Sequence, residues 1–250
     1  MPSTKDDGDV HKDIERIVPL GLTHDQAKAW FRHDVIQPLL ARAVLALILS
    51  SAIVIVMVTP TAEYFESTLT MHMVVQHLLL IIAGFLSAYA LDLLILVESR
   101  FSEGVSKSYA LLLRVNVDYN KRGVIAFVFA GLLTAYWHIP NNFDAAVLNE
   151  AVHMQMHFAF LVVGGLIFLG SKLLTRRMRH IAPIVAGKAM GLFGTFLLFT
   201  PSYVYDAYPA REQSETGLVM VIMMLAMDLT LVPYWLYNYF RKGSPSAVES

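Results

Sequence analysis

Long runs of apolar residues constrain this chain more than any other feature of its sequence. Hydrophobic residues make up 56% of the 250 positions and charged residues only 16%, whereas soluble domains carry about 25% charged residues. The apolar residues gather into runs, and a helix needs about 20 of them to cross a bilayer. The sequence therefore predicts an all-α fold, a polytopic membrane helix bundle.

Six runs are suitable as transmembrane helices. They cover residues 39–58, 71–97, 123–138, 152–170, 186–204 and 217–240. The third run is short, and we expect Lys121 and Arg122 to extend it by reaching the interface. Residues 1–38 would form an N-terminal tail with a short juxtamembrane helix after Thr23, and residues 241–250 a C-terminal tail.

Basic residues divide the segments outside these helices into two groups. Lysine and arginine are frequent in both tails and in the segments after the second and fourth helices. The other three connections, 59–70, 139–151 and 201–216, contain a single basic residue, Arg211. Because positive charge stays in the cytoplasm, we expect both termini to be cytoplasmic in a multi-pass protein of the cell membrane. The three charge-poor connections would face outward.

Five histidines lie near the outer ends of the second, third and fourth predicted helices. They are His72, His77, His138, His153 and His157. Polar side chains at membrane depth are costly, so they usually face the bundle interior and have a function. His153 and His157 share one helix face with Gly164, and a glycine lets a neighbouring helix approach closely. We therefore expect the second and fourth helices to pack with His77 facing this pair.

The histidines predict a metal site at the outer ends of these helices. The thioether candidates beside them are Met71, Met73, Met154 and Met156. Imidazole suits Cu(II), thioether suits Cu(I), and copper heads the affinity order at nitrogen sites. The chain has no cysteine, which excludes thiolate ligands. Copper is therefore the expected ion.

Other polar residues accompany this predicted site. Gln76 shares the arc of the second helix that carries His72 and His77, and Asp206 could reach the same region. Zinc, the first alternative to copper, could use the histidines with Glu150 or Asp144 but would leave the methionines unexplained. Haem, the second alternative, could take His77 and a histidine of the fourth helix as axial ligands.

Two carboxylates lie within the predicted spans. Asp228 is near the middle of the last helix, where we expect it to pair with a tyrosine or stay protonated, in a structural or a proton-linked role. Asp92 lies in the cytoplasmic half of the second helix, and we expect it to pair with Lys188 or Arg42.

Three segments resemble those of a known family. They are HMVVQHLLL at 72–80, WHIPNNFDAA at 137–146 and HMQMH at 153–157. They resemble the caa3-type cytochrome c oxidase assembly factors of the Bacillus type, multi-pass membrane proteins thought to help copper reach the oxidase. The resemblance covers residues 70–170, and a weaker resemblance is found at 212–220. The chain differs from the typical member, which is expected to have seven helices where six are predicted here. The resemblance implies as functional positions His72, Met73, His77, Trp137, His138, His153 and His157.

The expected function is that of a membrane copper-handling protein rather than an enzyme. It would assist the metallation of a respiratory oxidase or a related membrane copper enzyme through an outward-facing site of histidine and methionine. Its partners would be that enzyme and the lipid bilayer, and no nucleic acid. An intramembrane zinc-dependent hydrolase is one alternative, although the chain has no HExxH motif. A haem-binding electron-transfer subunit is the other.

The expected topology can be tested with single cysteines, because the chain has none of its own. An impermeant thiol reagent added to intact cells should label cysteine at positions 142 and 67, since these lie in charge-poor connections. It should not label cysteine at positions 106 or 244. The reverse pattern would reject this topology and the outward-facing site.

Overall fold

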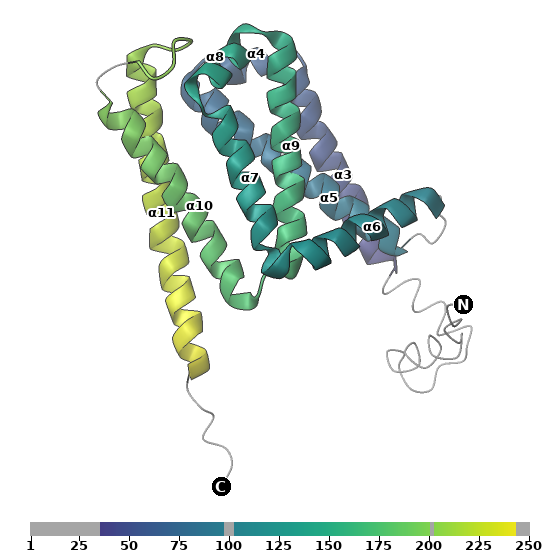
Figure 1. The fold of residues 1–250 in the computed structure, drawn as a ribbon. Helices are drawn as coiled ribbons and strands as arrows, with labels where there is room; N and C mark the ends of the chain where they lie inside the picture. Colours follow the sequence, from purple (N-terminus) through teal and green to yellow (C-terminus); the bar gives the residue numbers. More distant parts are fainter. Residues whose placement is uncertain (1–35, 98–102, 201–202, 244–250) are drawn as a thin grey trace, which may run out of the picture.

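The computed structural model describes residues 36–97, 103–200 and 203–243, and this part of the chain is helical without any strand. Five helical spans are long and apolar enough to cross a membrane. They are α3 (Gln37–Val58), η2 (Met71–Gln76) with α5 (His77–Val97), α9 (Glu150–Leu173), α10 (Arg176–Phe199) and α11 (Ala210–Gly243). The all-α membrane bundle is thereby confirmed (Figure 1).

A sixth crossing arises if two bent helices are taken together. These are α7 (Val124–Trp137) and α8 (Pro140–Leu148), whose axes meet at 66°. The bend follows from Pro140, which lies in the first turn of α8, because a proline disfavours helical geometry in the residue before it. The predicted third span at 123–138 thus corresponds to α7, with α8 turning away from it.

Some predicted boundaries differ from those in the structure. The span 71–97 agrees with η2 and α5, but α10 begins ten residues before the predicted start at 186. Thr175 caps α10, since its hydroxyl accepts a hydrogen bond from the Met178 N–H at 3.3 Å. The first turn of α10 is basic, but the apolar span already begins at Met178, so the predicted start was placed too late. In the same way α11 begins at Ala210 and not at 217, and it continues to Gly243. The helix predicted after Thr23 lies outside the described residues.

Two short helices cover one end of the bundle. These are α8 and α4 (Ala62–Glu66); α4 follows a turn that contains Pro60, α8 begins with Pro140, and both lie in charge-poor connections. Helix α4 packs against η2 and α8 against α9, and both lie at the same end of the bundle (Figure 1). Neither was predicted, because a helix of nine residues or fewer has little periodicity to detect.

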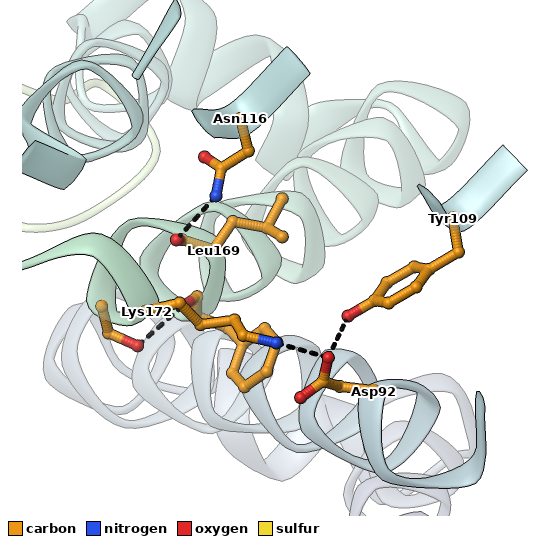
Figure 2. A network of polar contacts seen from close by, with 7 residues as sticks. Asp92, Tyr109, Asn116, Leu169 and Lys172 are labelled. Atoms are coloured by element: carbon orange, nitrogen blue, oxygen red, sulfur yellow. Dashed lines mark hydrogen bonds and ion pairs between the residues drawn. The ribbon is translucent and has the colours of Figure 1, made fainter. Parts of the chain in front are cut away.

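A third unpredicted helix, α6 (Glu103–Tyr119), lies across the opposite end of the bundle (Figure 1). It is held by polar contacts with α5 and α9, shown in Figure 2. The Tyr109 hydroxyl donates to an oxygen of Asp92 at 2.6 Å, and the Asn116 amide donates to the Leu169 carbonyl at 3.1 Å. Burial raises the pKa of Tyr109, with the hydrogen bond to Asp92 adding to the effect, so this phenol stays protonated and able to donate.

Both intramembrane carboxylates have partners other than those expected. Asp92 forms an ion pair with Lys172 of α9, and Asp228 forms one with Lys188 of α10. The expected pairings were wrong: Lys188 belongs to α10, which pairs with α11, and α9 supplies Lys172 to Asp92 although α3, which carries Arg42, also packs on α5. Since α5 packs on α9 and α10 packs on α11, each aspartate meets the lysine of its own partner helix. Pairing a charge is the usual way to lower its cost at membrane depth.

Helices α5 and α9 cross at a close backbone contact, as predicted from Gly164. A Cβ atom on Gly164 would lie 2.1 Å from the Ile81 carbonyl oxygen, and one on Gly84 would lie 2.0 Å from that of Leu161. Real Cβ atoms do not approach so closely, so only glycine fits at both positions. Small residues of this kind allow membrane helices to pack through their backbones.

We predict that Gly164→Ala lowers the stability of the bundle in detergent. The added methyl group would push α5 and α9 apart, and overpacking of this kind costs about 1–3 kcal/mol. The matched control is Gly165→Ala, because a Cβ there has no neighbour within 4 Å. Thermal unfolding of both variants checks this prediction, and equal midpoints for the two would contradict the described crossing.

Candidate metal centre

The structure brings the five predicted histidines together at the end of the bundle covered by α4 and α8. Measured between ring centroids, His72 lies 5.3 Å from His77 and 5.1 Å from His153. His77 lies 5.4 Å from His138, and His153 lies 4.3 Å from His157. The rings thus form a continuous cluster built from η2, α5, α9 and the end of α7.

The winding of η2 explains why His72 and His77 share a face. The His77 N–H bonds to the His72 carbonyl, which is the i→i+5 pattern of a π-helix and not the i→i+4 pattern of an α-helix. Residues five apart are therefore stacked more closely than the α-helical spacing assumed from the sequence would allow. Single π-turns of this kind occur frequently at functional sites.

Local signals in the chain also fix the start of α9. The Asn149 side chain accepts hydrogen bonds from the N–H groups of Ala151 and Val152 at 3.0 and 3.2 Å. An asparagine at this position satisfies backbone donors that the helix leaves free. The helix therefore begins at Glu150, and His153 and His157 project from its first two turns.

Much of the cluster is buried and lacks hydrogen-bond partners. The exposed fractions of His72, His77 and His157 are 0%, 3% and 4%. Within the described chain, eight buried side-chain nitrogen or oxygen atoms have no partner, and all lie on residues of this region. They are His72 Nε2, Gln76 Oε1, both ring nitrogens of His77, Trp137 Nε1, His153 Nε2 and both ring nitrogens of His157.

Such a concentration is unusual, because each unsatisfied buried polar group costs about 1–3 kcal/mol. Native proteins leave few such groups, and each calls for an explanation. A metal ion accepts imidazole lone pairs and would satisfy several of these atoms at once. The residues present therefore fit a metal site.

Two of the histidines are held with a ring nitrogen available as a ligand. His138 Nδ1 lies 2.7 Å from the Thr134 carbonyl, and since a carbonyl only accepts, Nδ1 carries the proton. His72 Nδ1 lies 2.8 Å from the Tyr208 hydroxyl, whose proton is donated to the Glu66 carbonyl at 3.1 Å. Nδ1 of His72 therefore also donates. In neutral rings both Nε2 atoms keep their lone pairs, as in metal-binding histidines whose other nitrogen is hydrogen-bonded.

Glu66 joins the cluster and was missed in the sequence. Its Oε1 lies 3.6 Å from His153 Nε2, and one ligand atom each from Glu66, His153 and His157 lie within 4.8 Å of one another. The residue ends α4 in the charge-poor connection 59–70, whose only carboxylates are Glu63 and Glu66. That scarcity is the one signal that could have drawn attention to it.

The predicted thioethers separate into buried and exposed groups. Met73 and Met156 are 3% and 0% exposed and belong to the apolar core around the histidines. Met154 is 48% exposed. The structure therefore does not bring Met154 to the cluster, and Met71 is half-buried at its edge.

Only some of the other residues predicted to accompany the site lie at the histidine cluster. Gln76 and Trp137 are buried at the cluster, whereas Glu150 and Asp206 are exposed and outside the converging group. Asp144 has a different role, since its carboxylate accepts the backbone N–H groups of Asp206 and Ala207 at 3.0 and 3.1 Å. It thereby attaches the connection between α10 and α11 to α8.

Comparison with known protein families shows to which family this chain belongs. The chain matches the model of the cytochrome c oxidase caa3 assembly factors (Caa3_CtaG) over residues 28–242. The chain belongs to this family. Neither the search of curated proteins nor that of solved structures found a match. The match confirms the resemblance seen in three motifs and extends it to most of the chain. As a Caa3_CtaG member, the protein has a role in cytochrome c oxidase assembly, which implies interaction with a respiratory oxidase.

The phenol that orients His72 should titrate unusually. Burial raises the pKa of Tyr208, and the nearby carboxylates of Glu66 and Glu212 raise it further. A raised pKa means that the folded protein keeps this proton above pH 10, the ordinary value for tyrosine. We predict that the difference in phenolate absorbance between wild type and Tyr208→Phe appears only above that pH. A difference that appears at or below pH 10 would place Tyr208 in water.

Proposed function

We propose that this assembly factor binds copper through its histidine cluster and delivers it to the oxidase on the extracytoplasmic side of the membrane. The observation that carries the proposal is the convergence of buried imidazoles whose ring nitrogens lack hydrogen-bond partners. Copper is favoured among the metals that imidazole binds because thioethers are buried in the same core.

The distribution of charge supports an extracytoplasmic site. The cluster lies at the end of the bundle covered by α4 and α8, in connections that contain no basic residue. The opposite end carries α6 and the start of α10, where basic residues are frequent. Since positive charge stays in the cytoplasm, the histidines would face outward, where copper can be received and passed on.

Delivery fits this arrangement better than transport across the membrane. A transport path would need exchangeable polar groups beyond the cluster. In the described parts of α5 and α9, the carboxylate below the cluster is Asp92, and it is engaged by Lys172 and Tyr109. The candidate ligands stop near one end of the bundle, as a site that loads and unloads from the same side requires.

One observation favours a second function, that of a zinc-dependent hydrolase. Two histidines and a glutamate, the residue types of Glu66, His153 and His157, also form the zinc site of some metalloproteases. A hydrolase needs a further base to activate water. Asp144 holds backbone N–H groups instead, and the oxygen of Glu212 accepts the Leu69 N–H at 3.0 Å. Membership of an assembly-factor family also favours a role that is not enzymatic.

The experiment that tests the proposal changes His153 and His157 together to alanine. The variant should insert and fold, because these rings lie at the end of the bundle and away from the glycine crossing. Its copper content should fall, and the host's copper-dependent oxidase should lose copper while its polypeptide remains. Elemental analysis of both purified proteins and the optical spectrum of the assembly factor check this.

The matched control is His180→Ala, since His180 lies on α10 against Tyr234, with 5.7 Å between ring centroids, and outside the cluster. It should leave the copper of both proteins unchanged. A double variant that keeps its copper, together with a fully metallated oxidase, would contradict the proposal. Zinc in place of copper in the wild-type protein would favour the hydrolase, and a Soret band would favour a haem protein.

A further inference from the structure

The histidine cluster divides into two parts that differ in ligand type and in how closely their ligand atoms approach one another. The outer part consists of Glu66, His153 and His157, and the side chains of Glu66 and His153 are 32% and 12% exposed. The inner part consists of His72, His77 and His138. Among the described residues, only the outer part has three ligand atoms that lie within 4.8 Å of one another.

We propose that Glu66, His153 and His157 form a three-ligand site for divalent copper that is distinct from the three inner histidines. This inference rests on the proposed function, to which it adds a ligand and a division of the cluster. A carboxylate with two imidazoles offers one oxygen and two nitrogens, a donor set that suits a divalent ion better than Cu(I), which prefers softer ligands. Because the side chains of Glu66 and His153 are partly exposed, an ion arriving from water can reach this site.

The position of Glu66 is itself maintained by contacts that a ligand requires. The Gln76 amide donates to Glu66 Oε1 at 3.4 Å, and the Tyr208 hydroxyl donates to the Glu66 carbonyl at 3.1 Å. These contacts connect the end of α4 to η2 and to the segment before α11. Partners of this kind orient the ligating carboxylates of metal sites.

A simple ion pair between Glu66 and His153 would not explain the arrangement. It would engage one ring nitrogen of His153 and leave both nitrogens of His157 without a partner, although His157 is only 4% exposed. The rings of His153 and His157 are 4.3 Å apart, which is close enough for both to approach one ion. A bound ion satisfies both histidines and the carboxylate together.

The test is a Cu(II) titration of the full-length protein in detergent against a chelator of known affinity, with electron paramagnetic resonance of the bound ion. Glu66→Gln keeps the shape of the side chain and removes its charge. Since loss of an outer-shell partner alone typically weakens metal binding roughly 10- to 100-fold, loss of this ligand should weaken Cu(II) binding by about tenfold or more. The spectrum should change as the anionic carboxylate oxygen is replaced by a neutral amide.

One control and one further variant separate this site from its surroundings. Glu63→Gln removes an exposed carboxylate from the same helix and should bind Cu(II) like the wild type. His77→Phe replaces an inner histidine, whose ring stacks on Phe160 at 3.9 Å, with an apolar ring of similar size. Because His77 belongs to the proposed copper-binding cluster, this variant is not a neutral control but the test of the division. The outer site should lose less affinity for Cu(II) in it than in Glu66→Gln, where a ligand is changed.

Each outcome decides one of the claims. Wild-type affinity and an unchanged spectrum in Glu66→Gln would overturn the inference while leaving copper binding by the histidines intact. Equal weakening by His77→Phe and Glu66→Gln would show a single shared site and overturn the division. Binding of Cu(I) but not of Cu(II) by the wild-type protein would overturn the inference, whereas failure to bind copper in either oxidation state would overturn the proposed function itself.

Discussion

The close crossing of α5 and α9 is the contact on which the rest of the structure depends. Gly84 and Gly164 let the two backbones touch, and this crossing sets the distance between the ends of the two helices. At one end it brings the histidines of η2 and α5 against those of α9. At the other end it places Lys172 beside Asp92, which in turn holds α6 through Tyr109 (Figure 2).

The cost of buried polar groups explains why the histidine end is more than a packing feature. A histidine used only for packing would be expected to have hydrogen-bond partners on its ring nitrogens, as buried polar atoms generally do. Here both nitrogens of His77 and of His157 have none in the described chain. His72 and His138 instead have one nitrogen fixed by a partner, which prepares the other for a ligand. Burying these ring nitrogens without hydrogen-bond partners destabilises the folded protein, and a bound metal ion would remove that cost.

Much of this could be predicted from the sequence, and what could not has physical causes. The apolar runs, the five histidines and Gly164 are visible because hydropathy and helical spacing report them directly. The helix α4 is not, because five residues leave no such pattern, and α6 was missed because its mixed polar and apolar residues do not form a run of membrane length. Glu66 was missed because its place beside His153 depends on a turn of the chain between α3 and η2. The partners of Asp92 and Asp228 depend on which helices pack together, and composition does not contain that information.

Copper K-edge X-ray absorption of the copper-loaded protein tests the central claim most directly. The outer-shell scattering of imidazole rings distinguishes histidine ligands from other donors, whichever oxidation state the ion has. We predict a first coordination shell that contains at least two imidazoles. A spectrum without imidazole scattering, from a protein that does retain copper, would contradict the assignment of the histidine cluster as the metal site.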